Sequence, residues 1–384
     1  MDVVVTGIGL VSALGALEAS WQKLVAGKSG IRLQQPFLEL EPLPLALIGE
    51  QPAKLTTLTQ LVVKSALADA GLATSLPECG VVIGSSRSHQ AVWEQMVRQM
   101  FLAQEFSDEW LETLPHMSAI AAARQVGSTI PLLAPMASCA TGIWAIAQGF
   151  ELIQTGQCQR VIAGAVEAPI TPLTLVGFNR MKALARTGAY PFDCCREGLV
   201  LGEGAAVLVL ESAQLAKSRA ASVYGQVLGF GFTADGYHIS RPEPGGKSAI
   251  AAVKQCLDHS SLRPADIDYV HAHGTATQLN DRHEAQLIQQ MFPRGIPVSS
   301  TKGATGHTLG ASGALGVAFC LMALKHQQLP PCVGLKEPEF DLELVTASRQ
   351  SEIRQLLCFS FGFGGQNAVL ALGKYFDDGG FCEK

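Results

Sequence analysis

The stretch that decides the fold is Pro135-Met136-Ala137-Ser138-Cys139-Ala140-Thr141-Gly142. It follows an apolar run, Thr129 to Ala134, with the length of a buried strand, and it precedes apolar residues at helical spacing between 143 and 153. Cys139 is therefore expected where a strand turns into a helix. Because a helix N-terminus stabilises a thiolate and lowers the pKa of a thiol, this position predicts a reactive nucleophile. The alternative is a buried cysteine that packs as a small hydrophobic residue.

The composition is typical of a densely packed α/β protein. Of 384 residues, 48% are apolar, 16% are charged and 39 are glycine, which favours many tight connections between strands and helices. This length suits two or three domains, or one large duplicated unit. The net charge of −5 gives no general attraction to nucleic acid or to an anionic membrane, so neither is an expected partner.

The cysteines and the N-terminus indicate a soluble protein of the cytoplasm. The ten cysteines lack the short spacings of zinc sites, and the adjacent pair Cys194-Cys195 suits neither a metal site nor an easy disulfide. Residues 1–5 have no basic segment and are expected to form a first strand and not a signal peptide. Long apolar runs such as Gly313 to Leu324 are predicted to be too short to span a bilayer.

One internal repeat predicts two related halves. Gly202 to Leu210 matches Gly364 to Leu372 as a glycine turn that leads into an apolar strand. A helix opened by Cys139 in the first half has a counterpart in the small-residue-rich segment 307–324. We interpret the chain as halves 1–211 and 212–384 packed as one body. The alternative is chance similarity between two short glycine-strand junctions.

Two other motifs are ambiguous. Gly7 and Gly9 follow the first apolar run and suggest a dinucleotide-binding turn, but the third glycine of that pattern is Ser12, so this interpretation is disfavoured. Residues 90–112 are polar, aromatic and acidic and are expected to form a solvated helical face.

Polar segments in the second half follow three predicted strands. They are 271–277, 302–307 and 362–365, and each contains glycine. An α/β sheet places its active site at such strand ends, so we expect these segments to converge. A metal site of His271, His273 and Asp281 is disfavoured, because two histidines that flank one residue of a strand only partly satisfy the ligand geometry.

Together these segments closely resemble the β-ketoacyl-acyl carrier protein synthases, the elongating condensing enzymes of the thiolase fold. The resemblance covers nearly the whole chain, in the family's order: Val3 to Gly9, Ser138 to Gly142, Glu167 to Pro169, Pro191 to Asp193, Gly202 to Gly204, His273 to Thr277, Lys302, Gly306-His307 and Gly362 to Gly365. It implies an α/β fold of the thiolase-like type, with two related α/β halves forming a layered αβαβα core. It also implies an acyltransferase that uses no redox cofactor and whose substrates are carried on the phosphopantetheine of acyl carrier protein.

The resemblance implies a decarboxylative Claisen condensation. Cys139 would take an acyl group from a thioester of acyl carrier protein, and malonyl thioester would lose CO2 to give the attacking carbanion. His273 and His307 would donate to the oxygen of the developing enolate. Lys302 would orient His307 and add positive charge.

The resemblance also assigns supporting roles. The backbone N–H groups of Cys139 and Phe363 would form the oxyanion hole, and Phe363 would gate the acyl pocket. The residues expected to hold the pantetheine arm are Thr275 and Thr277, and those expected to anchor the site as carboxylates are Asp281 and Glu284.

Several positions depart from the family pattern. Arg87 stands where fatty-acid members have an aliphatic or small residue that lines the acyl tunnel, so either Arg87 turns outward or the pocket takes a shorter or more polar acyl group. Gly316 stands where many such members have glutamate, as in polyketide-type synthases. A basic cluster could dock an acidic carrier protein or be a plain solvated loop: Arg180, Lys182 and Arg186.

The expected protein is thus a homodimeric elongating synthase of fatty acid or related acyl-chain biosynthesis. Two alternatives are a specialised polyketide or secondary-metabolite ketosynthase with a short or polar acyl substrate, and a ketosynthase-like partner subunit that does not condense. Initiating synthases, which use a Cys-His-Asn set, and thiolases, which use a second cysteine, are disfavoured by the two histidines.

Overall fold

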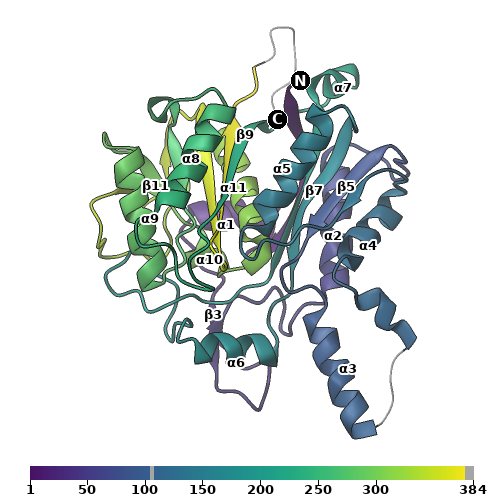
Figure 1. The fold of residues 1–384 in the computed structure, drawn as a ribbon, viewed down its shortest axis with the longest axis vertical. Coiled ribbons are helices and arrows are strands. Elements are labelled where there is room, and N and C mark those ends of the chain that lie inside the picture. The colour runs from purple at the N-terminus through teal and green to yellow at the C-terminus, as the bar shows by residue number, and fades with distance from the viewer. Residues whose placement is uncertain (104–107, 377–384) are drawn as a thin grey trace.

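The first strand, β1 (Val3–Ser12), is buried along its whole length and joins the two halves of the protein. In the computed structural model, which describes residues 1–103 and 108–376, β1 pairs antiparallel with β8 (Gly204–Ser212) on one side and with β9 (Gly225–Ala234) on the other (Figure 1). One mixed sheet of twelve strands results within these residues. Its other strands are β2 (Gly15–Ala16), β5 (Cys79–Gly84), β6 (Leu132–Leu133), β7 (Arg160–Glu167), β10 (Tyr269–His271), β11 (Pro297–Ser299), β13 (Glu343–Leu344), β15 (Gln355–Gly362) and β16 (Gln366–Gly373).

The strand order repeats between the two halves. The neighbouring strands in the first half are β6-β5-β7-β8-β1, and those in the second half are β11-β10-β15-β16-β9. If these strands of each half are numbered in sequence order, both halves have the sheet order 3-2-4-5-1. In both, the fourth strand pairs antiparallel with the fifth, and the fifth with the first. The predicted fold class is therefore confirmed. The division at residue 211 stays a prediction, and residue 211 lies inside β8, one residue before the end of this strand.

Alternating residues of the strands face different helices, which defines the layers. In β8, Leu208 and Leu210 belong to the core shared with the central helices, whereas Val207 and Val209 face an outer helical layer. In β16, Leu370 faces the central core in the same way. The helices are α1 (Leu17–Val25), α2 (Leu55–Asp69), α3 (Gln90–Ala103), α4 (Met117–Val126), α5 (Thr141–Gln154), α6 (Pro172–Arg180), α7 (Ala213–Ser218), α8 (Lys247–His259), α9 (Gln278–Met291), α10 (Lys302–Thr305) and α11 (Ser312–His326).

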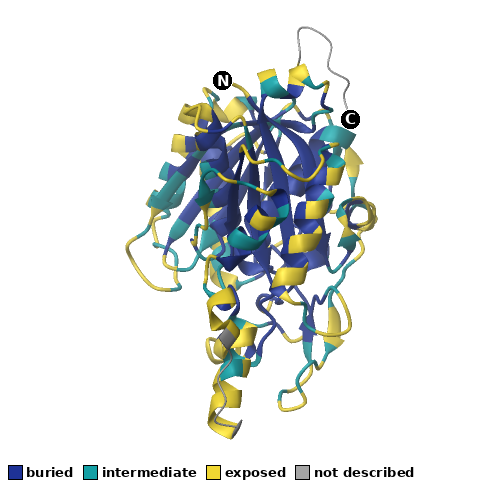
Figure 2. Ribbon diagram, turned by 90° about the vertical axis from the view of Figure 1, so that its right-hand side faces the viewer, coloured by how far each residue is buried: buried dark blue, intermediate teal, exposed yellow. Residues whose placement is uncertain are grey.

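The layers follow the predicted αβαβα order. Helices α2 and α4 pack on the outer face of the first-half strands, and α8 and α9 pack on the outer face of the second-half strands. Helices α5 and α11 lie between the two sets of strands, and Figure 2 shows that this interior is almost entirely buried. The remaining short elements are β3 (Arg32–Gln34), β4 (Leu43–Leu45), β12 (Gln328–Leu329), β14 (Arg349–Gln350) and the 3-10 helices at Asp108–Thr113, Pro264–Asp266 and Leu309–Ala311.

Two glycines permit close contacts between these layers. A Cβ atom at Gly142 of α5 would lie 2.4 Å from the backbone nitrogen of Ala314 in α11. A Cβ atom at Gly9 of β1 would lie 1.9 Å from the carbonyl oxygen of Val62 in α2. The glycine at position 9 therefore serves helix-strand packing, which agrees with the rejection of a dinucleotide-binding turn.

The segment 309–326 is long and apolar enough to cross a membrane, but 89% of it is buried inside the protein. The expectation that the apolar runs are too short is therefore wrong for this segment. Its apolar character is explained by its position, because α11 contacts strands of both halves and presents a buried residue on every side from Ser312 to Leu324.

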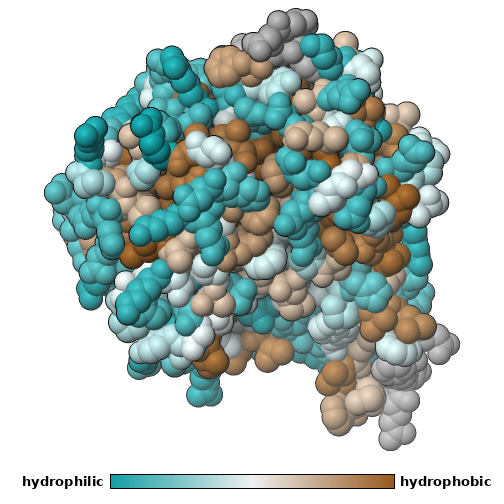
Figure 3. Space-filling view, turned by 45° about the horizontal axis from the view of Figure 1, so that its top comes forward, coloured by the Kyte–Doolittle hydropathy of each residue, from teal (hydrophilic) through white to brown (hydrophobic). Residues whose placement is uncertain are grey.

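The prediction of a buried strand just before Cys139 is wrong. The run 129–134 is not a buried strand: only Leu132–Leu133 is extended, and the Leu133 side chain is 37% exposed, because β6 is the last strand of the sheet and pairs only with β5. The prediction of a solvated helical face in 90–112 agrees with the structure, because α3 is a largely exposed helix. Its exposed residues include hydrophobic ones such as Phe101 and Leu102, and Figure 3 shows hydrophobic side chains at the surface of this region at lower right. The acidic residues of this segment lie partly outside the described residues.

Replacing Gly142 by alanine is expected to destabilise the protein by about 1–3 kcal/mol, the usual range for overpacking a core. The new methyl group would collide with the backbone of α11. Gly177→Ala is a matched control, because it also lies in a helix but has nothing within 4 Å of its Cβ position, and it should stabilise by up to about 1 kcal/mol. Chemical denaturation measures both variants, and equal effects would contradict the close contact.

Candidate active site

Cys139 lies in a tight turn that is held from three directions. Ser138, just before it, adopts a left-handed conformation with φ of +50°. In the first turn of α5, the Thr141 hydroxyl donates to the Ser138 carbonyl oxygen (2.7 Å) and accepts from the Ala137 N–H group (2.9 Å). The Ser360 hydroxyl of β15 donates to the Cys139 carbonyl oxygen (2.9 Å). The sulfur is thereby fixed in a buried position, with the residue only 7% exposed.

His273 lies in the loop after β10, and α9 fixes the backbone of that loop. The N–H groups of His273 and Gly274 donate to the two oxygens of Glu284, at 2.5 and 2.7 Å. Asp281, one turn earlier, accepts from the N–H groups of Phe192 (2.8 Å) and Ala276 (3.2 Å). Burial raises the pKa of Asp281 to about 6 and that of Glu284 to about 7. The structure thus places both predicted carboxylates behind the loop, where they hold backbone amides.

Lys302 opens α10, which follows β11, and His307 lies just after α10. The partners of both side chains differ from the expected ones. The Lys302 ammonium contacts the His273 carbonyl oxygen and lies 3.4 Å from His273 Nδ1. His307 Nδ1 lies 2.8 Å from the hydroxyl of Ser312, the first residue of α11. The prediction that Lys302 orients His307 is therefore wrong: His307 lies beyond α10, after Gly306, and its ring faces the start of α11.

Ser312 is a site residue that the sequence interpretation missed. Its only signal was a serine five residues after His307, near the start of the predicted small-residue helix. A hydroxyl at this place can either donate to Nδ1 or accept from it, so it fixes the ring without fixing the tautomer.

The three predicted reactive side chains converge. The Cys139 sulfur and ring nitrogens of His273 and His307 all lie within 4.8 Å of one another, and all three residues are buried. The two imidazole rings are nearly perpendicular, with centroids 5.4 Å apart. The first half supplies the sulfur and the second half supplies both imidazoles, which matches the expected convergence.

Burial dominates the electrostatics of this site. It raises the pKa of the Cys139 thiol to about 11, although the Lys302 charge, the backbone N–H of Phe363 and the Arg87 charge all lower it. Burial also holds the pKa of His273 and of His307 well below the usual range. Burial therefore opposes the lowering of the thiol pKa that the helix N-terminus predicts, and it favours a thiol and two neutral imidazoles at neutral pH.

A cleft of about 520 Å³ opens onto these three residues. Thr275 and Thr277 line it, with their hydroxyl oxygens 2.9 Å apart. Phe363 also lines it: its backbone N–H donates to the Cys139 sulfur, and its ring stacks on Phe178 with centroids 6.0 Å apart.

The basic residues around the cleft are only partly those predicted. Lys182 lines the cleft, whereas Arg180 and Arg186 are exposed and do not line it. Arg241 and His238 also line it and were missed, because they lie in a polar loop with no pattern that distinguishes them from other surface residues.

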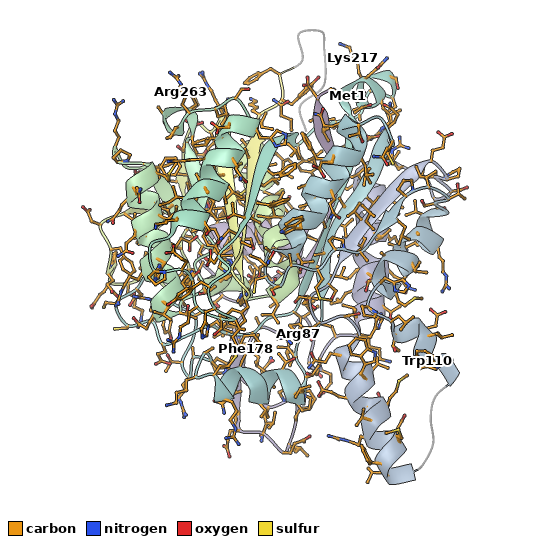
Figure 4. The ribbon with its side chains drawn as sticks, in the orientation of Figure 1. Met1, Arg87, Trp110, Phe178, Lys217 and Arg263 are labelled. Atoms are coloured by element: carbon orange, nitrogen blue, oxygen red, sulfur yellow. The ribbon has the colours of Figure 1, made fainter. Side chains whose placement is uncertain are left out.

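Arg87 does not itself line the cleft, but its side chain lies against Phe178, which does. Its guanidinium carbon lies 5.6 Å from the centre of the Phe178 ring, and Figure 4 shows the two residues together above α6. Its backbone N–H donates to Glu167 (2.9 Å). Gly316, the other departure, has its Cβ position blocked by His271 and Cys358, at 2.9 and 3.0 Å.

His271 and Asp281 do not join His273 in a common cluster. His271 Nε2 lies 3.1 Å from the Thr301 hydroxyl and Nδ1 lies 3.7 Å from the Cys358 sulfur. The side chains of His271 and His273 thus serve different environments, as expected for this strand end.

Known proteins match the chain over nearly its whole length. The family described as "Beta-ketoacyl synthase, N-terminal domain" matches residues 50–216, and "Beta-ketoacyl synthase, C-terminal domain" matches residues 224–336. A 3-oxoacyl-[acyl-carrier-protein] synthase 2 of Staphylococcus aureus strain COL is 32% identical, over 97% of this chain and 98% of its own. A putative mitochondrial 3-oxoacyl-[acyl-carrier-protein] synthase of Schizosaccharomyces pombe is 33% identical, over 97% and 99%.

Solved structures agree. A ketosynthase of a type II polyketide synthase, in complex with its acyl-carrier protein bound to the hexaketide, has a TM-score of 0.92 at 25% identity, covering 97% of this chain and 99% of its own. A β-ketoacyl synthase from Burkholderia phymatum STM815 has a TM-score of 0.87 at 28% identity, covering 98% and 100%. With the strand order and the Cys-His-His convergence, these matches show that the chain belongs to the β-ketoacyl synthase family, the condensing acyltransferases of the thiolase superfamily.

Proposed function

We propose that the protein condenses an acyl group held on Cys139 with a malonyl group held on acyl carrier protein, giving β-ketoacyl-acyl carrier protein and CO2. The observation that carries this proposal is the convergence of the Cys139 sulfur with two neutral imidazoles within 4.8 Å. One nucleophile and two uncharged proton carriers suit a reaction in two steps, each with its own oxyanion.

In the first step, Cys139 accepts the acyl group. Because the thiol is protonated at rest, it needs a base, and His307 Nε2 is available when Nδ1–H donates to Ser312. The sulfur attacks the thioester carbonyl, and the backbone N–H groups of Cys139 and Phe363 stabilise the oxyanion. The carbon-sulfur bond to pantetheine then breaks, and the pantetheine thiolate takes the proton from His307.

In the second step, malonyl thioester loses CO2 and the electron pair of the broken carbon-carbon bond forms an enolate. His273 Nδ1 faces the Lys302 ammonium, so its proton belongs on Nε2, which donates to the enolate oxygen. His307 adds a second donor when the Ser312 hydroxyl turns to donate to Nδ1. The enolate carbon attacks the acyl carbonyl, Cys139 leaves as thiolate, and a proton restores the thiol.

The same proposal assigns the binding residues. Thr275 and Thr277 hold the pantetheine arm in the cleft, and Arg180, Lys182 and Arg186 meet the acidic carrier protein. Decarboxylation itself supplies the electron pair for the new bond, so we infer that the chemistry requires no redox cofactor. A partner subunit that does not condense is disfavoured, because the complete Cys-His-His-Lys set is present and converges.

The test separates the two steps in purified protein. Cys139→Ala should form no acyl-enzyme and no product, while His273→Asn should still be acylated but should lose about 10²–10³-fold in condensation, as when an oxyanion donor is removed. His307→Asn should slow acyl transfer by about 10²–10⁴-fold, the range for general base catalysis. Mass spectrometry follows the acyl-enzyme, and product formation by Cys139→Ala would refute the proposal.

Alkylation of Cys139 by iodoacetamide is expected to accelerate by about tenfold per pH unit between pH 7 and pH 10, because only the thiolate reacts. The pKa of this thiol is raised to about 11, so the thiolate fraction still grows throughout this range. Peptide mass spectrometry distinguishes Cys139 from the exposed Cys194 and Cys195. A rate that is already constant at pH 7 would show a thiolate at rest.

We also infer that the protein works as a homodimer in the cytoplasm. β6 leaves one side of its strand unpaired at the sheet edge, with Leu133 and Met136 37% and 59% exposed, which suits pairing with a second copy. The nine cysteines of the described residues are all free, which supports a reducing compartment.

Leu133→Lys should convert the dimer to monomer in analytical ultracentrifugation, because it places a charge in the interface. Leu38→Lys is the control, since Leu38 is 89% exposed and lies in the turn between β3 and β4, which form a separate sheet. A monomeric wild-type protein, or a folded Leu133→Lys variant that stays dimeric, would contradict this interface.

A further inference from the structure

The backbone of Arg87 is fixed by the buried carboxylate of Glu167. This carboxylate accepts the backbone N–H groups of Ser86, Arg87 and Gly310 at 2.8, 2.9 and 3.0 Å. It also accepts the hydroxyls of Ser85 and Ser86, at 2.8 and 2.6 Å. Five donors therefore occupy the two Glu167 oxygens, and they hold the start of the Arg87 side chain in one direction.

The Arg87 guanidinium is directed into the apolar surroundings of the reactive sulfur. It lies over Phe178, which belongs to a buried hydrophobic cluster with Cys139, Ile170 and Leu309. The Phe363 ring stacks on the Phe178 ring, with centroids 6.0 Å apart. The Arg87 charge is close enough to Cys139 to lower the pKa of its thiol.

This cation has no counter-ion in the part of the chain that the structure describes. The ion pairs of residues 1–103 and 108–376 do not include Arg87, and the nearby Glu167 uses its oxygens for the donors named above. A cation over an aromatic ring gains only a modest stabilisation, and a half-buried charge without a partner is costly. The acyl site therefore has a place for an anion.

We propose that the acyl group loaded on Cys139 ends in a carboxylate, which pairs with the Arg87 guanidinium, and that the enzyme selects short ω-carboxyacyl groups. This inference rests on the proposed function, because it names the acyl group that Cys139 carries. The acyl chain enters the cluster to which Cys139 belongs, and its terminal carboxylate reaches the cation beside Phe178. We expect the chain to be short, because the Arg87 guanidinium lies only 5.6 Å from the centre of the Phe178 ring, and Phe178 belongs to the same cluster as Cys139.

The experiment compares acyl carrier proteins that differ only at the end of the acyl chain. Succinyl, glutaryl and adipyl groups are matched with butanoyl, pentanoyl and hexanoyl groups, and intact-protein mass spectrometry gives the rate of Cys139 acylation. For at least one length, the carboxyl-terminated group should react about tenfold or more faster, as expected for a charge-assisted pair. Wild-type protein that prefers the methyl-terminated group at every length would overturn the inference.

Variants of Arg87 show whether the cation is the cause. Arg87→Ile should slow Cys139 acylation by the carboxyl-terminated groups by about tenfold and accelerate acylation by the methyl-terminated groups, so the preference between the two series is inverted. Arg87→Lys should still prefer the carboxyl-terminated groups. Arg263→Ile is the matched control: this arginine is exposed, lies at the far end of the molecule in Figure 4, and should leave the wild-type ratio unchanged. Thermal unfolding confirms that each variant is folded.

The outcomes separate this inference from the proposed function. If neither series acylates Cys139, the proposed function fails. If the methyl series acylates Cys139 well and the carboxylate series does not, only the role of Arg87 fails. If Arg87→Ile slows both series equally, Arg87 acts on the sulfur and not on the substrate, which also overturns the inference.

Discussion

The active site depends on the contact between α5 and α11, where no side chain separates Gly142 from the backbone of Ala314. These helices occupy equivalent positions in the two halves, so their N-termini come to the same place at the centre of the molecule. Cys139 lies two residues before the start of α5, and Ser312 opens α11 beside His307. A duplicated fold thereby brings a nucleophile from one half beside the proton carriers of the other.

The second constraint is burial, which favours the uncharged forms of Cys139, His273 and His307 at rest. Desolvation penalises the Cys139 thiolate more than the nearby positive charges stabilise it, so the pKa of the thiol is raised. Desolvation also penalises the imidazolium forms of His273 and His307, so the pKa of both histidines is lowered. Neutral imidazoles can each accept or donate one proton without leaving a buried charge. The carboxylates of α9 contribute indirectly, because they bind the backbone of the His273 loop and do not face the sulfur.

Much of this site was predictable from sequence, because each reactive residue follows a strand and precedes a glycine or a helix. Cys139, His273, Thr275 and Phe363 lie where the motifs placed them, and the strand repeat correctly indicated two related halves. The protonation state of Cys139 was not predictable, since a helix N-terminus favours the thiolate and only the packed structure shows how strongly burial opposes it. Motif order also could not show that Lys302 contacts His273 and that Ser312 contacts His307, because those pairings depend on ring orientation. The position of β6 at the edge of the sheet was also not predictable, because an apolar run does not show whether a strand pairs on its second side.

The central claim is that the resting site holds two neutral imidazoles beside a protonated thiol. NMR spectroscopy of protein with ¹⁵N-labelled histidine, recorded between pH 5.5 and pH 8, measures it most directly, with His273→Asn and His307→Asn assigning the two signals. The account predicts that both rings stay neutral throughout this range, since burial lowers both pKa values well below 6.5. Titration of either ring with a pKa near 6.5 would contradict it.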